Sequence, residues 1–431
     1  MSDKYRISMP EKNYREFLNF QFLFAAAVVG FASAGFSFLV DKAFVYCHMV
    51  FNYGGYWMFL FTPSIFVVTV FLLKKFFPFS DGSGLPQGYA IDVFSEQEIN
   101  QHYSIRTAIG KAILTFMSIL GGASLGKEGP TIQICSSIFA QIKGITLEKK
   151  RLLIKLAAGV GVAAAFNTPL GGMIFAIEEY VRKISAKSAT MLVGGTLIAV
   201  VINSYFSGDL EYMGSISLSL LNHGFSIGYF ALFIGLICGL GGALFTKVIV
   251  FVSVNNTWFI NRLRKNHYLL NALVFGLVVA LIGYLTNGLS FGNGANATKY
   301  FVDNNIQAPW YYGVSKFFGA ISSVAAGVPG GYFSTALSIG AGIGDLVHHF
   351  VPNIPLVQFY LLGMVGFLAS ITQSPITATA MVVEMSNTSE FAIPILIAAF
   401  IASMIAEFFG DSVYHQQVLK YIPEEKYHLT R

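Results

Sequence analysis

Residues 125–142, LGKEGPTIQICSSIFAQI, decide how this sequence folds, because a similar segment returns later in the chain. That second segment, residues 330–347, reads GGYFSTALSIGAGIGDLV. In both copies glycines precede a helix-length run of small and apolar residues, and Gly126 corresponds to Gly331, 331 − 126 = 205 residues on. The match indicates that the chain contains two related halves.

A second repeated pair supports the same division. Residues 163–180, AAAFNTPLGGMIFAIEEY, resemble residues 368–385, LASITQSPITATAMVVEM. The two prolines lie 375 − 169 = 206 residues apart, so the offset is nearly the same as for the glycines. In each copy a glutamate follows the proline by nine residues: Pro169 and Glu178, then Pro375 and Glu384.

The composition places these halves in a membrane. Of 431 residues, 55% are hydrophobic and 11% are charged, and the mean hydropathy is +0.62. Soluble domains carry about 25% charged residues. Apolar runs such as 17–38, 229–252 and 392–409 approach the ~20 residues that span a bilayer, whereas 113–120 is too short. We therefore expect an all-α polytopic membrane protein.

Many of the 43 glycines interrupt apolar runs, which predicts tilted and broken helices around a protein-walled cavity. Duplicated halves with such interruptions are typical of transporters that bind their substrate between the repeats. We place the halves at about 17–205 and 224–420. The sequence leaves open whether the repeats are parallel or inverted.

No Pro/Ser-rich linker or charge block divides the chain, so we expect one integral membrane domain, 1–431, without a C-terminal soluble regulatory domain. The net charge of +5 is too thinly spread for nucleic-acid binding. Basic pairs such as Arg182–Lys183 flank apolar runs, as cytoplasmic loops of membrane proteins do. Three scattered cysteines indicate neither a disulfide framework nor a metal site.

Four stretches could hold an anion: GSGLP (82–86), GKEGP (126–130), GGYFST (330–335) and GDSVYHQQ (410–417). The first three are glycine-rich turns at predicted helix starts, where unpaired N–H groups and the helix dipole attract anions. Ser83 and Tyr414 could add hydroxyl donors, and such neutral donors suit a halide better than a phosphate. Each motif alone is also compatible with an ordinary helix cap.

Glu128 is the most informative single residue. GGASLGK (121–127) begins like a phosphate-binding loop, but Glu128 stands where that loop needs Ser or Thr. Burying a lone carboxylate in a membrane is costly, so its presence indicates function. At a helix start it could occupy an anion site when charged and leave that site when protonated, which would couple anion and proton occupancy.

Glu178 and Glu179 form a second acidic site at the end of an apolar helix. Adjacent helical residues diverge by about 100°, so we expect the pair to face different surroundings. One would face solvent or a subunit contact, and the other would face the transport route. The alternative places both at a membrane surface beside Arg182 and Lys183.

In order and spacing, GSGLP, GKEGPTIQI and GGYFST resemble the three signature motifs of the CLC chloride channels and transporters. The resemblance extends over nearly the whole chain and implies an inverted-repeat fold, a homodimer with one pathway per subunit, and cytoplasmic termini. Lys111 falls where some members carry a buried lysine. The resemblance also implies roles for six residues: anion binding by Ser83, Tyr332, Phe333 and Tyr414, gating and proton transfer by Glu128, and inner proton transfer by Glu179.

Two residues depart from the family pattern: Thr335 replaces the usual proline of the third motif, where we expect it to begin or cap a helix, and Lys127 replaces the commoner arginine. The serine of the first motif resembles that of chloride-selective members, and the fluoride-exporting branch carries a different first motif. We therefore expect a chloride/proton antiporter of a prokaryotic inner membrane. The alternative is a passive gated chloride channel.

Other classes are disfavoured by what the sequence lacks. An intramembrane enzyme would need a nucleophile–base or metal set, and the sequence contains no H-E-x-x-H and no paired intramembrane Asp. We expect no cofactor, and the expected partners are chloride, protons, the lipid bilayer and a second copy of the chain.

Overall fold

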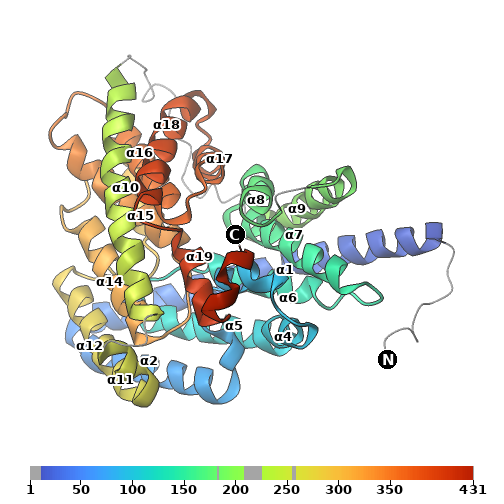
Figure 1. The fold of residues 1–431 in the computed structure, drawn as a ribbon. Coiled ribbons are helices and arrows are strands. Elements are labelled where there is room, and N and C mark those ends of the chain that lie inside the picture. Colours follow the sequence, from blue (N-terminus) through green and yellow to red (C-terminus); the bar gives the residue numbers. More distant parts are fainter. Residues whose placement is uncertain (1–10, 182–183, 208–225, 255–258, 431) are drawn as a thin grey trace.

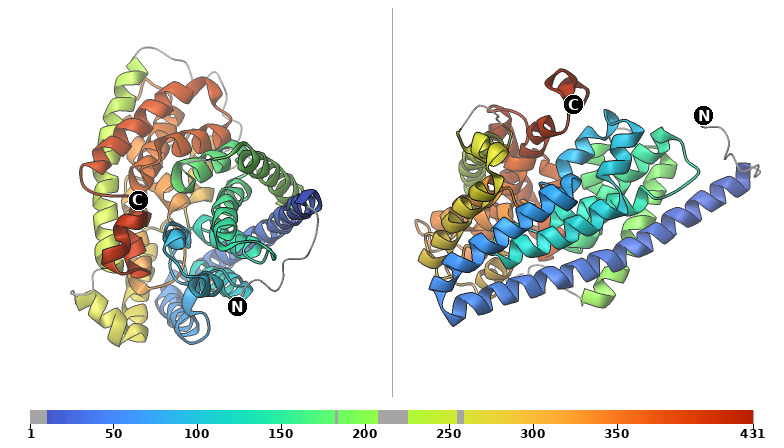
Figure 2. Two further views of the ribbon diagram at one scale, coloured as in Figure 1. Left: turned by 45° about the vertical axis from the view of Figure 1, so that its right-hand side comes forward. Right: turned by 90° about the horizontal axis from the view of Figure 1, so that it is seen from below.

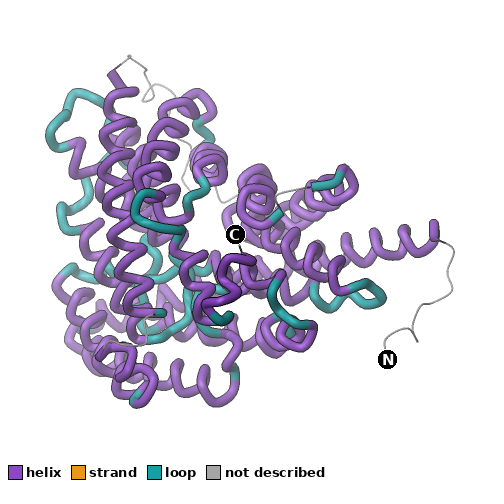
Figure 3. Tube along the Cα trace, viewed as in Figure 1, coloured by secondary structure: helices purple, strands orange, loops and turns teal. Residues whose placement is uncertain are grey.

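The computed structural model describes residues 11–181, 184–207, 226–254 and 259–430. The first ten residues, the Arg182–Lys183 pair and the join between the halves lie outside the described residues, as do the expectations that rest on them. The described residues form helices joined by loops and contain no strand (Figure 3).

Each half contributes a series of helices. The first contains α1 (Glu11–Tyr53), α2 (Met58–Phe76), α3 (Leu85–Tyr89), α4 (Glu96–His102), α5 (Ile105–Leu120), α6 (Glu128–Phe139), α7 (Leu147–Phe166), α8 (Pro169–Phe175) and α9 (Ala186–Ser207). The second contains α10 (Ser226–Ser253), α11 (Phe259–Asn266), α12 (Tyr268–Leu285), α13 (Ala295–Asp303), α14 (Tyr312–Ala326), α15 (Phe333–His348), α16 (Leu356–Thr372), α17 (Pro375–Ser386), α18 (Ala392–Glu407) and α19 (Val413–Gln417).

The helices gather in two groups (Figure 1). In one group α6 and α9 pack on α7, and α1 packs on α9; in the other, α15 and α18 pack on α16, and α10 packs on α18. The helix α1 runs across the first group, and its N-terminal end projects from the body (Figure 2). The α2 helix crosses to pack against α12, so the two groups interlock.

Helix lengths agree with the uneven apolar runs of the sequence. Among the described residues, six helices are long and apolar enough to cross a membrane: Phe20–Tyr53, Gly55–Phe76, Ala186–Phe206, Ile227–Ser253, Tyr268–Leu285 and Ser389–Glu407. By contrast, α3 has five residues, α8 has seven and α6 has twelve. Such short helices are stable in a bilayer only when other helices surround their ends. The expected mixture of spanning and broken helices is confirmed.

The two halves meet at their matching glycines. The Gly126 N–H donates to the Gly331 carbonyl at 2.8 Å, and the Gly331 N–H donates to the Gly126 carbonyl at 2.8 Å. The two segments run antiparallel, so this reciprocal pair lies on a local two-fold axis. Asn167 and Gln373, at matching positions before the repeated prolines, both adopt a left-handed φ of 58°. The sequence repeat is therefore also a repeat of backbone conformation.

Close glycine contacts pack the helices behind this axis. A Cβ on Gly340 of α15 would lie 2.1 Å from the carbonyl oxygen of Gly363 in α16. In the first half, a Cβ on Gly172 of α8 would lie 2.4 Å from the carbonyl oxygen of Gly159 in α7. Small residues allow the backbones of two helices to come this close. In a bilayer the hydrophobic effect does not drive helices together, so they associate through such close packing.

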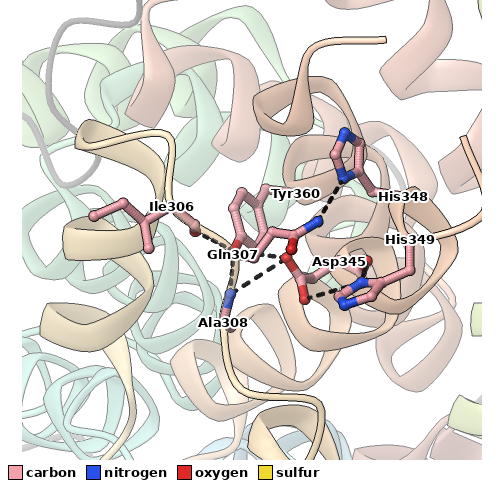
Figure 4. Close-up of polar contacts among 7 residues, drawn as sticks. All are labelled: Ile306, Gln307, Ala308, Asp345, His348, His349 and Tyr360. Atoms are coloured by element: carbon pink, nitrogen blue, oxygen red, sulfur yellow. Dashed lines mark hydrogen bonds and ion pairs between the residues drawn. The ribbon is translucent and has the colours of Figure 1, made fainter. Parts of the chain in front are cut away.

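A polar cluster fixes the far end of α15 (Figure 4). The Asp345 carboxylate lies 3.0 Å from the Tyr360 hydroxyl and accepts the Ala308 N–H at 3.3 Å. The Tyr360 hydroxyl also donates to the Ile306 carbonyl at 2.8 Å, and His348 Nδ1 lies 3.2 Å from the Gln307 amide nitrogen. These contacts tie the loop before α14 to α15 and α16. They hold α15 in place, so its opposite end can form a rigid binding site.

Candidate functional site

The three helix starts predicted to meet an anion do begin at the expected motifs, as α3, α6 and α15, and the fourth stretch contains the short helix α19. Gly84 precedes α3 in a left-handed conformation, φ 102°, which favours glycine. A Cβ on Gly129 would lie 2.8 Å from the Ser83 carbonyl oxygen and 3.3 Å from Gly331 Cα. The starts of α3, α6 and α15 therefore come together in the interior, at the two-fold axis.

Two hydroxyls at this meeting point can donate to an anion. Tyr414 is buried, and its hydroxyl has no hydrogen-bond partner among the described residues. Its ring stacks on Tyr332 and Phe333, with centroid separations of 5.6 and 5.7 Å. The fully buried Ser83 accepts the Leu85 N–H at 3.4 Å, so its hydroxyl proton remains available. Both hydroxyls are neutral donors and lie near the start of α15, so their role in binding an anion stays a prediction.

The Glu128 carboxylate lies where α6 and α15 begin, and it is fully buried. The Ser334 hydroxyl donates to Glu128 Oε1, and the Ser334 backbone N–H also faces the carboxylate. Glu128 Oε2 has no partner among the described residues and lies over Gly126, where a Cβ would be 2.1 Å from it. A carboxylate held by helix N-termini occupies the place of a bound anion.

Lys127 does not pair with its neighbour Glu128. Its ammonium lies 3.6 Å from the Asp41 carboxylate of α1, and both residues line a cavity of about 280 Å³ beside Glu128. We call this the Lys127 cavity. Asn293, Asn296 and Lys299 also line it.

A smaller cavity of about 30 Å³ reaches the other side of the site, next to Gly82 and Tyr332. We call it the Lys420 cavity. Three cations line it together with one carboxylate: Lys74, Arg264, Lys420 and Asp81. Cations outnumber carboxylates in both cavities, which raises the local concentration of anions.

Lys111 is fully buried, as its position in the family predicts. Its ammonium donates to the carbonyl oxygens of Asp81 at 2.7 Å and Gly82 at 2.9 Å. The lysine therefore clamps the loop that presents Ser83 and adds a positive charge behind it.

Both carboxylates of the glutamate pair bond to the start of α17. Glu178 accepts the N–H groups of Ile376 at 3.2 Å and Thr377 at 2.7 Å, and the Ser374 hydroxyl donates to Glu179. Glu178 lies beside Ile376, which is 49% exposed, whereas Glu179 lies beside the buried Ser374, so the expectation that the pair faces different surroundings stays a prediction. They lie in a π-helical turn, Ala176–Tyr180, where neighbouring side chains diverge less than in an α-helix.

Glu384 completes a reciprocal arrangement between α8 and α17. Its carboxylate accepts the N–H groups of Leu170 at 3.1 Å and Gly171 at 2.9 Å, at the start of α8. Glu178 and Glu384, which correspond in the repeat, thus each cap the helix of the other half. Met385 occupies the position that corresponds to Glu179, so only the first half carries this second carboxylate.

Thr335, which stands where the family usually has proline, does not disturb its helix. It neither begins nor caps that helix, contrary to the expectation from the sequence. The α15 helix begins at Phe333, so Thr335 lies in its first turn. Its hydroxyl is directed to the Ser124 carbonyl oxygen, 3.3 Å away, in the loop before α6. The residue links the two halves beside the glycine pair.

Three residues at the site were missed in the sequence: Lys316, Asn293 and Ser334. Lys316 lies 316 − 111 = 205 residues after Lys111, the same offset as the glycines, so the repeat could have found it. Asn293 sits in a Gly-Asn-Gly that corresponds to the Gly-Ser-Gly of the first motif. Its offset from Ser83 is 293 − 83 = 210 residues, five more than the others, because the segment from Asn293 to Lys316 is five residues shorter than the segment from Ser83 to Lys111, and this hid the match. Ser334 had no sequence signal, since its role depends on the folded position of Glu128.

The sequence is similar to known proteins over most of its length. Residues 64–407 match the family model "Voltage gated chloride channel". Chloride channel protein C of Dictyostelium discoideum is 26% identical over 424 residues, which cover 80% of this chain and 55% of that protein, so the chain spans about half its length. The H(+)/Cl(-) exchange transporter ClcA of Yersinia pestis bv. Antiqua (strain Angola) is 25% identical over 382 residues, 84% of this chain and 77% of that one.

Among solved structures, a slow cyanobacterial Cl-/H+ antiporter superposes with a TM-score of 0.80 at 22% identity, covering 94% of this chain and 99% of that chain. The likeness confirms the all-α polytopic fold of the CLC type. The family match covers most of the sequence, including the starts of α3, α6 and α15. This chain belongs to the voltage-gated chloride channel family.

Proposed function

We propose that this protein exchanges chloride for protons across a membrane, with one anion pathway in each chain. The observation that carries the proposal is the Glu128 carboxylate, buried at the joint start of α6 and α15 and held there by Ser334. A free anion can bind at this position only after the carboxylate of Glu128 has left it. Protonation removes the negative charge of the carboxylate and so favours its departure. The ClcA relative is named as an H(+)/Cl(-) exchange transporter, which supports the same function.

In this proposal, chloride lies between the Ser83 and Tyr414 hydroxyls and the N–H groups at the start of α15, at Tyr332 and Phe333. Tyr332 lines the Lys420 cavity, and Lys127, the neighbour of Glu128, lines the Lys127 cavity. Binding by neutral donors is strong enough to replace part of the hydration shell and weak enough for release.

Glu179 distinguishes exchange from passive conduction. Its carboxylate accepts a hydrogen bond from the neutral Ser374 hydroxyl, and a neutral partner lets a carboxylate gain and lose a proton without breaking an ion pair. A passive gated channel of the same family is the alternative, and it needs Glu128 but gives Glu179 no role.

An outward chloride gradient is expected to drive protons uphill into liposomes that contain the purified protein. The reason is that each chloride leaving the site between Ser83 and Tyr414 makes room for the Glu128 carboxylate, which carries protons the other way. The measurement is internal pH, followed by a trapped dye, together with chloride efflux. Chloride efflux with protons remaining at equilibrium would favour the channel.

We further propose that the single integral domain, 1–431, assembles as a homodimer in a prokaryotic inner membrane, with both termini cytoplasmic. Apolar side chains on α8, α17 and α18 support the dimer: Leu170 is 60% exposed, Ile376 is 49% exposed and Ile393 is 72% exposed. The expected mass in mild detergent, measured by light scattering, is that of two copies of 47.0 kDa. A protein mass of one copy would contradict the assembly.

A further inference from the structure

The Lys420 cavity gathers positive charge from three separate elements. Lys74 lies in the last turn of α2, Arg264 lies in α11, and Lys420 ends the turn Val418–Lys420 that follows α19. All three line the cavity, and the charges of Lys74 and Arg264 act on Lys420. Like charges held this close repel one another, and a bound anion would turn that repulsion into attraction.

The one carboxylate of the cavity, Asp81, does not neutralise these cations. Its Oδ1 accepts the Tyr421 hydroxyl at 3.0 Å, and it takes part in none of the ion pairs among the described residues. Three cations and one carboxylate leave the lining with a formal charge of 3 − 1 = +2. An anion that carries more than one negative charge therefore suits the cavity best.

Most of the hydrogen-bond donors of these cations are not used within the described part of the chain. A guanidinium has five N–H donors, and that of Arg264 makes one contact there, from Nη1 to the Val252 carbonyl oxygen at 3.5 Å. The Lys74 and Lys420 ammonium groups line the cavity without a hydrogen bond to any described residue. A guanidinium fork beside ammonium groups is the donor set that proteins use to bind phosphate.

The cavity lies where two membrane-spanning helices end. The span Gly55–Phe76 finishes two residues after Lys74, and the span Tyr268–Leu285 begins with Tyr268, which lines the cavity. The helices α2 and α12 pack together, with α11 beside α12 (Figure 1). Because both spans end here, the cavity lies at the depth of the lipid headgroups. Exposed apolar side chains, such as those of Phe71 and Leu270, adjoin it along the two spans.

The size of the cavity limits what can enter it. Its volume of about 30 Å³ holds about two water-sized groups, since one such group needs about 10–15 Å³. Phosphate oxygens fit this space, whereas a nucleotide base or a sugar does not. A phospholipid could place its phosphate oxygens here and keep its acyl chains in the bilayer.

We infer that the Lys420 cavity binds the phosphate group of an anionic phospholipid from the cytoplasmic leaflet, and that the bound lipid slows the entry of chloride. Basic residues beside spanning helices favour the cytoplasmic side, and basic pockets between such helices bind anionic headgroups there. Gly82 and Tyr332 also line the cavity, so the phosphate would lie beside the loop of Ser83 and the start of α15. Its negative charge would offset the cations that attract chloride.

The first test measures lipid binding without transport. Short-chain phosphatidic acid, whose phosphomonoester carries about 1.5 to 2 negative charges at neutral pH, is titrated by calorimetry into the detergent-solubilised protein. Short-chain phosphatidylcholine and inorganic phosphate are titrated in parallel and should bind much more weakly. We expect Arg264→Gln and Lys420→Gln each to weaken the binding of phosphatidic acid about tenfold, the effect of losing a hydrogen bond between charged groups.

Lys265→Gln is the matched control for Arg264→Gln. Lys265 is an exposed cation of the same helix, α11, but it does not line the cavity. Its removal should leave the affinity for phosphatidic acid unchanged. Chloride flux in neutral liposomes reports whether each variant is folded.

The second test follows chloride efflux from phosphatidylcholine liposomes with and without phosphatidic acid. The ratio of the two fluxes is compared between variants, because the general surface potential of the lipid acts on all of them alike. Phosphatidic acid should slow the unmodified protein and Lys265→Gln to the same extent. The double variant Arg264→Gln/Lys420→Gln should lose most of this sensitivity.

Equal binding of phosphatidic acid by the unmodified protein and by both cavity variants would overturn the site. Inorganic phosphate that bound as tightly as phosphatidic acid would show that the phosphate comes from solution, and the lipid would be the wrong source. Flux ratios that were the same in all variants would overturn the effect on chloride entry. None of these outcomes depends on proton coupling, so a failure of the proposed exchange would leave lipid binding untouched.

Discussion

Glu128→Gln is expected to leave chloride flux through the protein while reducing proton movement to the background of empty liposomes. Glutamine has nearly the same shape as a protonated glutamate but cannot release a proton. The buried position at the start of α6 and α15 would then hold a neutral amide, which competes poorly with a free anion. Chloride movement should become insensitive to pH, since the group that responds to pH is gone.

The measurement pairs chloride efflux with internal pH in the same liposomes. Glu390→Gln, at an exposed residue of the turn Ser389–Phe391, is a suitable control because it removes a carboxylate that belongs to neither the anion site nor the glutamate pair. It should retain coupling. Proton pumping that survived Glu128→Gln would remove the gating role assigned to this residue and leave its burial without a functional reason.

The second large effect is expected from Glu179→Gln, which should stop proton transport while chloride still moves. The anion position of Ser83 and Tyr414 does not include this side chain, so chloride binding is preserved. The carboxylate at Glu179 is replaced by an amide that can still contact the Ser374 hydroxyl, so the start of α17 remains in place. What is lost is the capacity to take up a proton.

Glu178→Gln provides the matched control, one residue away. The Ile376 and Thr377 N–H groups bond to different carboxylate oxygens, and the single amide oxygen of glutamine can accept one of them, so the cap on α17 is weakened by about 1 kcal/mol. Coupling should persist in this variant. If Glu178→Gln and Glu179→Gln lost coupling equally, the effect would arise from the helix cap and the assignment of Glu179 as proton acceptor would be wrong.

Much of the fold could be predicted from the sequence, because its determinants are local. Glycine-rich turns before apolar runs mark the starts of α3, α6 and α15 whatever surrounds them. The constant offset between Gly126 and Gly331 predicted two halves, and the structure adds that these two residues bond to each other. The sequence alone contained no information on that contact, because an offset specifies correspondence and not proximity.

The site was less predictable where a side chain's partner comes from the other half. Glu178 and Glu179 have partners at the start of α17, in the other half, and the sequence did not predict these contacts. Ser334 contacts Glu128 across 206 positions of sequence. Asn293 was hidden by the shorter segment between it and Lys316, although its flanking glycines repeat those of Ser83.

The reciprocal glycine pair marks a symmetry that the acidic residues of the protein do not follow. Two halves related by a two-fold axis provide two equivalent positions for an anion. Every acidic group to which we assign proton chemistry comes from one half, since Phe333 stands opposite Glu128 and Met385 opposite Glu179. The duplicated scaffold therefore supplies an anion path that is the same from both ends. Two glutamates present in one half only give the proton a path with different ends.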